Sequence, residues 1–215
     1  MSLRRFSRVL LLAGGAALLA AAGYAYGLRA SPPQALGPSA VDIGFAQFMR
    51  SHHDQAIVMT EILLADRSSK LAGMASAMQA AQLIEIGQMK GWLLLWDKPL
   101  LPASDSMDWM LLGQQPPSEA LNRYLIACRN SPGGMPGLAT AEELQRLRTL
   151  QGDERDRLFL QLMVKHHQGG LPMAQFAVDN ARLPAVRLLA AQMVVEQTRE
   201  MATMALMARR ASPVQ

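Results

Sequence analysis

The sequence predicts an all-α fold in which two helical hairpins, joined by a long crossover, form a four-helix bundle behind an N-terminal hydrophobic helix. Half of the 215 residues are hydrophobic, few are aromatic, and strong helix formers such as Ala, Leu, Met, Gln, Glu and Arg dominate. Apolar residues also recur at steps of three and four along four long segments, which is the spacing of one helix face. The length suits one domain and a short leader.

The N-terminal segment is typical of an export signal. Arg4, Arg5 and Arg8 precede an apolar stretch over residues 9–26, which is the order of charge and hydrophobicity that secretion signals share. Residues 1–27 are therefore predicted to be a signal peptide or, because about 18 apolar residues just suffice to cross a bilayer, an uncleaved membrane anchor. Either alternative places the protein outside the cytoplasm, in the periplasm, the cell envelope or the extracellular space.

Charge and cysteine content exclude two further features. The first 27 residues hold three Arg and no acidic residue, so the formal net charge of +4 falls to +1 without them. We therefore expect no nucleic-acid partner. Cys128 is the only cysteine, so no internal disulfide stabilises the fold.

A proline-rich linker over residues 28–40 separates the leader from a domain predicted over residues 41–210. The first hairpin of this domain, residues 41–97, has helices over about 41–64 and 71–96 and a short turn at 66–69. Short connections between long helices favour antiparallel neighbours.

Proline and glycine punctuate the crossover, residues 98–152, and leave room only for short helices near 104–112 and 118–129. Thr140 and Glu143 fit a capping box that begins another brief helix, which Gly152 is expected to end. The second hairpin, residues 153–210, has helices over about 153–180 and 184–210, and Pro172 is expected to kink the first of them.

The two hairpins repeat each other, which indicates an internal duplication. The first helices match at an offset of 114 residues and the second helices at 115, after a one-residue insertion. The matched residues are Met49, His52, His53 and Met59 with Met163, His166, His167 and Met173, and then Gln82, Glu85 and Met89 with Gln197, Glu200 and Met204.

Each repeat places a histidine and two methionines on one helical stripe. In the first repeat Met49, His52 and Met59 share this stripe with the small residue Ala56, and the second repeat has the equivalent stripe with Gly170 in place of Ala56. A small residue leaves space beside an imidazole, and a bound ion requires such space. The sequence therefore predicts metal ligation by the four histidines His52, His53, His166 and His167 and the four methionines Met49, Met59, Met163 and Met173.

Neighbouring histidines in a helix diverge by about 100 degrees, so each pair is expected to divide its roles. His52 and His166 are the preferred core ligands, while His53 and His167 face a neighbouring helix or hold a carboxylate. Glu85 and Glu200 are candidates to accept the second N–H of an imidazole. Gln82, Met89, Gln197 and Met204 are candidate auxiliary residues, although the glutamines and glutamates fit a pairing across the bundle equally well.

Imidazole and thioether form a soft donor set, which favours copper, especially Cu(I), over magnesium or calcium. Zinc is a weaker candidate, through His and Glu alone. Thioether is also a sensible substitute for thiolate in an oxidising compartment, and the chain has fifteen Met and one Cys.

These motifs resemble those of the domain of unknown function 305 family. The resemblance runs from about residue 45 to 207 and rests on segments such as Phe48-Met49, His52-His53 and Ala56-Ile57 in the first repeat, which the second repeat matches. It implies a ferritin-like four-helix bundle that is secreted or anchored outside the cytoplasm, with copper binding in metal tolerance among some members. Gly170-Leu171-Pro172 departs from the Ala-Ile that the family usually has before the second methionine.

Other functions are weighed against metal binding. Methionines on a helical stripe often only fill a core, so a metal-free envelope interaction or scaffold bundle is the alternative. A haem-type electron carrier lacks a covalent attachment motif. A di-iron site requires Glu three residues before a ligand histidine, where this chain has Met49 and Met163, and without a phosphate loop or catalytic triad no enzyme is expected. Self-association into a homo-oligomer is left open.

Overall fold

The computed structural model describes residues 3–29, 37–65 and 69–210, and these form helices and connecting segments without a strand. Two compact units divide the chain, residues 1–36 and residues 37–215. The first contains helix α1 (Leu3–Arg29). Within the described residues no helix is long and apolar enough to cross a membrane. The cleaved signal and the uncleaved anchor both stay predictions, and most of the predicted linker lies outside the described residues.

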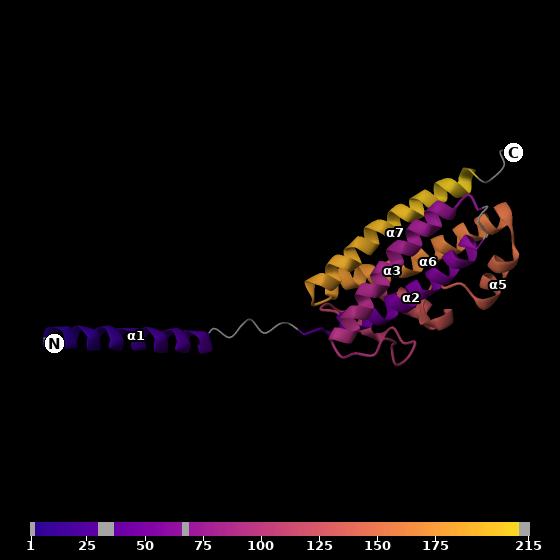
Figure 1. Ribbon diagram of the computed structural model, residues 1–215. Helices are drawn as coiled ribbons and strands as arrows, with labels where there is room; N and C mark the ends of the chain where they lie inside the picture. The colour runs from indigo at the N-terminus through magenta and orange to yellow at the C-terminus, as the bar shows by residue number, and fades with distance from the viewer. Residues whose placement is uncertain (1–2, 30–36, 66–68, 211–215) are drawn as a thin grey trace. The chain divides into compact units, whose positions relative to one another are not determined.

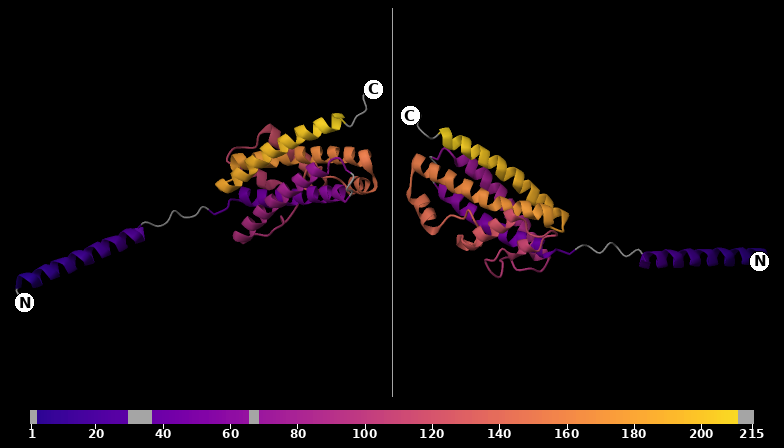
Figure 2. Two further views of the ribbon diagram at one scale, coloured as in Figure 1. Left: turned by 45° about the horizontal axis from the view of Figure 1, so that its top comes forward. Right: turned by 180° about the vertical axis from the view of Figure 1, so that it is seen from behind.

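The second unit is a bundle of two helical hairpins, as predicted (Figure 1). Helices α2 (Ala40–Leu64) and α3 (Ala72–Leu95) pack together as the first hairpin, and α6 (Gly152–Asn180) and α7 (Pro184–Arg210) as the second. The hairpins meet along α2 and α6. The views in Figure 2 show these helices side by side from two further directions.

Helix α2 begins where the sequence provides an N-terminal cap. The Ser39 hydroxyl accepts the Asp42 N–H, and the Asp42 carboxylate accepts the Ser39 N–H at 2.7 Å. The same buried carboxylate accepts the backbone N–H groups of Arg182 and Leu183, at 3.2 and 2.9 Å. One acidic side chain therefore joins the start of the first hairpin to the turn of the second.

The crossover contains α4 (Glu119–Arg129), α5 (Ala141–Thr149) and two 3₁₀ turns, η1 (Asp108–Leu111) and η2 (Pro132–Gly134). The prediction of a helix near 104–112 was wrong in extent, because only the η1 turn is helical there and residues 102–107 are irregular. The role predicted for Gly152 was also wrong. Helix α5 ends when Leu150 becomes extended, and Gly152, with φ +52°, is the first residue of α6.

Helix α6 continues through Pro172 as one assigned helix, and the predicted kink stays a prediction. Two hydrophobic clusters form the core of the bundle. The first contains the N-terminal half of α2 and the C-terminal ends of α3 and α6, and the second contains the opposite halves of these helices together with Leu147 of α5. Both clusters lie wholly within residues 37–215, so this unit has the core that it needs to fold without the leader.

Candidate metal centre

A buried polar layer crosses the bundle between the two hydrophobic clusters. Helices α2 and α6 supply the histidines and helices α3 and α7 supply the amides and carboxylates, as the duplicated sequence requires. The four histidine side chains are 0% exposed. The layer consists of His52, His53, Gln82, Glu85, His166, His167, Gln197 and Glu200.

The second helices hold one histidine of each pair. His53 Nε2 lies 2.7 Å from Glu85 Oε2, and His167 Nε2 lies 2.6 Å from Glu200 Oε2. These equivalent contacts place Glu85 and Glu200 each beside an imidazole, and their role in orienting a metal ligand stays a prediction. The Glu200 side chain, which is 26% exposed, is the least buried group of the layer.

The other two histidines meet where α2 crosses α6. The rings of His52 and His166 are in contact, with their centroids 3.7 Å apart and their planes tilted by 32°, and His166 Nε2 donates to the backbone carbonyl of His52 at 2.9 Å. The cross-helix bond to a carbonyl was not foreseen from the sequence. Spacing along a single helix carries no signal for it, because it depends on how closely the two hairpins approach.

Hydrogen-bond chemistry fixes which ring nitrogen carries a proton. A carbonyl oxygen can only accept, so Nε2 of His166 must be the donor, and in the neutral ring Nδ1 then keeps a bare lone pair. Nε2 of His53 and of His167 faces a carboxylate oxygen, which accepts, so Nε2 is the donor in these two rings as well. Nδ1 of all four histidines is buried and has no hydrogen-bond partner within the described residues, and neither has Nε2 of His52. A bare, buried imidazole nitrogen is the form that binds a metal ion.

The electrostatic environment keeps two of the rings neutral. Burial, and to a smaller extent the charge that a protonated His167 would carry, lowers the pKa of His166 to about 3. Burial also lowers the pKa of His52 well below its usual range, with His166 contributing in the same direction. At neutral pH both imidazoles are therefore available as lone-pair donors.

The methionines predicted as ligands are fully buried but do not all lie together. Met49 and Met173 belong to the first hydrophobic cluster, and Met59 and Met163 to the second. The two methionines of each predicted stripe fall on opposite sides of the histidine layer, because the histidine lies between them along its helix. Since α2 and α6 run antiparallel, each side combines one methionine from each repeat. Met89 and Met204, also fully buried, lie in the first and the second cluster respectively.

Gly170 makes room for the His52 ring. A Cβ at this position would lie 2.9 Å from His52 Cε1 and 3.4 Å from Gln197 Oε1. The departure from the family motif at this residue therefore has a steric reason. The equivalent residue in α2 is Ala56, which belongs to the second cluster.

We expect Gly170→Ala to lower the free energy of unfolding by about 1 kcal/mol, because the displaced His52 ring is packed on all sides. The sign of this change is informative. In a helix interior alanine is more favourable than glycine by about 1 kcal/mol, so the substitution would stabilise the protein if the His52 ring did not interfere. Urea unfolding of the variant and the parent measures this difference, and a gain in stability would contradict the packing described.

A backbone crossing lies over the layer on the side of α6. A Cβ on Gly169 would come within 1.8 Å of the Pro136 carbonyl oxygen, and one on Gly137 within 2.4 Å of the Lys165 carbonyl oxygen. The crossover segment therefore runs directly against the turn of α6 that carries His166. Sequence reasoning missed this contact, although two adjacent glycines inside a helix are a signal of close backbone approach.

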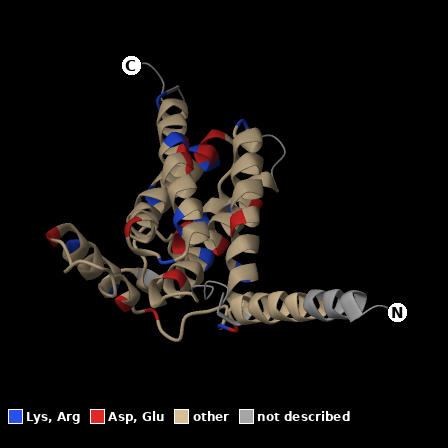
Figure 3. Ribbon diagram, turned by 90° about the vertical axis from the view of Figure 1, so that its left-hand side faces the viewer, with Lys and Arg blue, Asp and Glu red and all other residues tan. Residues whose placement is uncertain are grey.

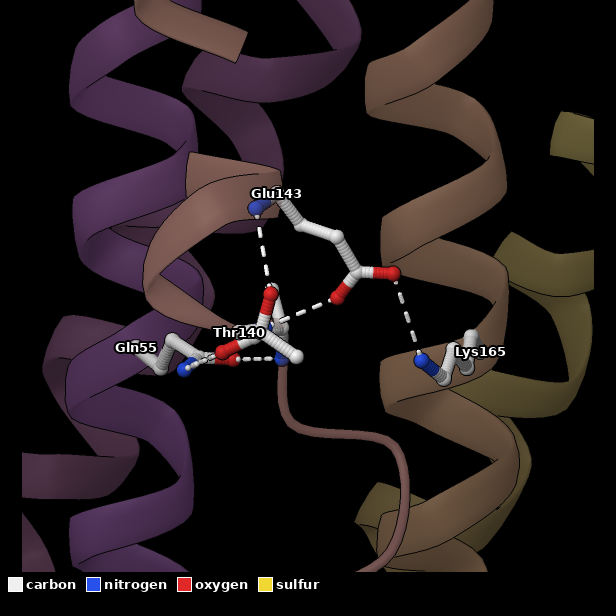
Figure 4. Close-up of polar contacts among 5 residues, drawn as sticks. Gln55, Thr140, Glu143 and Lys165 are labelled. Atoms are coloured by element: carbon white, nitrogen blue, oxygen red, sulfur yellow. Dashed lines mark hydrogen bonds and ion pairs between the residues drawn. The ribbon is translucent and has the colours of Figure 1, made fainter. Parts of the chain in front are cut away.

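Hydrogen bonds and an ion pair connect this segment to α2 and α6, the first helices of the two hairpins (Figure 4). The Gln55 amide donates to the Ala139 carbonyl at 2.9 Å and accepts the Ala139 N–H at 2.6 Å. Thr140 and Glu143 form the predicted capping box of α5, and Glu143 also pairs with Lys165 at 3.5 Å. The segment and the two helices thus enclose the histidine layer.

Throughout the part of the chain that the structure describes, no group of three His, Cys, Asp or Glu side chains is arranged to hold a metal ion. The other predicted donors are the four buried methionines of the two stripes. Ligation itself stays a prediction.

Comparison with known proteins places the chain in a family. Residues 42–208 match the family described as Domain of unknown function (DUF305). No curated protein matches the chain.

Solved structures resemble the chain over most of its length. A candidate secreted DUF305 protein from Streptomyces coelicolor is 31% identical, with a TM-score of 0.67, over 80% of this chain and 93% of that one. A DUF305 fragment from Deinococcus radiodurans is 27% identical, with a TM-score of 0.62, over 81% and 99%. CopM in its Cu(I)-bound form is 25% identical, with a TM-score of 0.57, over 80% and 98%. The predicted all-α, ferritin-like four-helix bundle is confirmed, and this chain belongs to the DUF305 family.

Proposed function

We propose that this protein is an exported, non-enzymatic metal-binding protein that takes up a soft metal ion, first of all Cu(I), at the histidine layer and its flanking methionines. One observation carries the proposal: four fully buried imidazoles each present an Nδ1 without a hydrogen-bond partner in the described structure. Burying such groups without partners costs free energy, and a bound ion would supply one.

The donor set selects the metal. Neutral imidazole and thioether are soft to borderline ligands, whereas calcium and magnesium require clustered oxygens, and the two carboxylates of the layer are already paired with His53 and His167. His52 with Met49 and Met173 would bind an ion on one side of the histidine layer. His166 with Met163 and Met59 would bind an ion on the other side. The role proposed for Glu85 and Glu200 is to hold His53 and His167 with Nδ1 unprotonated.

Two comparisons support the proposal. CopM has been solved with Cu(I) bound, and a DUF305 protein of Streptomyces coelicolor is described as a candidate secreted protein. The apolar segment over residues 9–26 agrees with export. Binding, storage and tolerance all require uptake of the ion, so uptake is the property to measure.

A metal-free envelope scaffold is the second candidate, and one observation favours it. The two His–Glu pairs and the contact between the His52 and His166 rings already join all four main helices. Such a layer can fix the register of a bundle without an ion. This candidate predicts that loss of the histidines changes stability but not metal uptake.

The test is a Cu(I) titration of residues 37–215 against a chromophoric chelator without oxygen. Replacing Met59 and Met163 by Leu, which keeps the core volume, is expected to weaken Cu(I) binding by about tenfold or more. The matched control replaces Met78 and Met193 by Leu. These buried methionines lie on α3 and α7, outside the two stripes, so their replacement is expected to leave the affinity for Cu(I) unchanged. Changing His52 and His166 to Ala should abolish tight binding. A parent protein that is folded and helical but binds no Cu(I) would leave the scaffold as the better account.

A further inference from the structure

The outward face of α3 is unusually apolar for a helix that borders solvent. Leu83 and Ile84 are 50% and 63% exposed, and Leu94 and Leu95 are 67% and 81% exposed. Helix α3 has two charged residues, Glu85 and Lys90, and Glu85 is buried in the histidine layer. Figure 3 shows the basic and acidic residues along the chain in blue and red. A helix that is apolar on both faces is normally covered on both.

The second repeat shows that the fold does not require this face. At the offset of 115 residues, Leu83 corresponds to Thr198, Ile84 to Arg199 and Leu94 to Arg209. Helix α7 has six charged residues where α3 has two. Helices α3 and α7, which are equivalent in the two hairpins, thus differ mainly in the polarity of their exposed residues.

Two glycines make the centre of the face shallow. Gly87 and Gly91 lie in the interior of α3, are exposed, and have no atom of the described structure near the place where a Cβ would stand. A glycine in a helix interior costs about 1 kcal/mol relative to alanine. Together the glycines form a notch, flanked by large apolar side chains, that lets another helix approach closely.

The residues of this face are arranged symmetrically about position 89. Counting outward from position 89, Gly87 mirrors Gly91, Ile84 mirrors Leu94, and Leu83 mirrors Leu95. At about 100 degrees per residue these six positions fall within about a third of the helix circumference. A two-fold interface needs a surface that is complementary to itself, and an antiparallel helix pair centred at 89 meets this requirement.

We propose that α3 is covered by α3 of a second copy of this chain, in an antiparallel pair with glycines opposite glycines at its centre. Ile84 of one copy then packs on Leu94 of its partner, and Leu83 on Leu95. Lys90 lies at the edge of the face, where a long side chain can keep its ammonium group in water. A lipid surface could also cover these apolar residues. Lipid contact does not depend on the order of residues along the helix, however, and so does not explain their symmetry about position 89.

Sedimentation velocity of residues 37–215 from about 1 to 100 µM, with a metal chelator present, tests the pairing. We expect a monomer–dimer equilibrium within this range, because the contact is a single helix face of the smallest interface class. Leu94→Glu should leave a monomer at every concentration. The matched control is Leu206→Glu on α7, which changes a leucine of similar exposure (58%) and should leave the dimer intact. A monomeric parent, or equal dissociation by the control, would overturn the proposal.

Disulfide trapping tests the antiparallel register. The double variant Ile84→Cys with Leu94→Cys should form a covalent dimer under mild oxidation, whereas each single variant should not, because like positions lie about 15 Å apart in the pair. Cys128 is buried and does not compete. Efficient trapping of the single variants would contradict this register. Binding of the parent to phosphatidylcholine vesicles, lost in Leu94→Glu, without self-association would replace the second copy by a lipid surface.

Discussion

Lowering the pH from 7 to 4.5 is expected to destabilise the bundle by about 2.5 kcal/mol through His166 alone. Its pKa is lowered from 6.5 to about 3 by burial in the folded protein. Between these two values the unfolded chain binds a proton that the folded protein excludes. Stability therefore increases with pH over this window and is lost as the pH falls below about 6.5. His52, whose pKa is lowered in the same direction, adds to the loss.

Urea unfolding at pH 7 and at pH 4.5, with a chelator present, measures the effect. The carboxylates of the chain also titrate in acid, so the informative quantity is the difference between the parent and His166→Gln. Glutamine can still donate to the His52 carbonyl but does not titrate, and the variant should lose correspondingly less stability between the two pH values. Equal losses in parent and variant would show that His166 is not a buried neutral ring.

The long helices could be predicted from the sequence, because apolar spacing over about seven turns gives helix limits that lie within a few residues of the structure. For His53 and His167 the sequence left two roles open, facing a neighbouring helix or holding a carboxylate. It did not identify the imidazoles that Glu85 and Glu200 contact, and the structure pairs them with His53 and His167 respectively.

The arrangement between the hairpins could not be predicted, because no periodicity records it. The stripe along α2 places Met49 and Met59 on either side of His52, but which methionine of α6 joins each of them depends on the antiparallel packing of the two helices. The close approach of the His52 ring to His166 depends on the missing Cβ of Gly170. Sequence spacing predicts which side chains share a helix face, whereas the site depends on how two such faces meet.

Gly169→Ala is expected to lower the free energy of unfolding by about 3 kcal/mol, the upper end for overpacked sites. The new methyl group would stand 1.8 Å from the Pro136 carbonyl oxygen and 3.0 Å from Gly137 Cα. Both are backbone atoms, so no rotation of a side chain can relieve the contact. The crossover segment cannot simply retreat, because Gln55 holds Ala139 by two hydrogen bonds and the Tyr124 hydroxyl donates to the Gly169 carbonyl. The clash therefore forces α6 and the segment apart at the turn that carries His166.

Chemical unfolding of Gly169→Ala beside Gly73→Ala separates this steric effect from the intrinsic preference for alanine. Gly73 lies exposed in the first turn of α3 with no atom near its Cβ position, so its replacement should be neutral or stabilise by up to about 1 kcal/mol. If the crossover segment encloses the histidine layer, Gly169→Ala should also speed hydrogen exchange of amides in residues 135–140 more than elsewhere in the bundle. A fully stable Gly169→Ala would mean that the segment does not lie against α6, and the layer would then be open on that side.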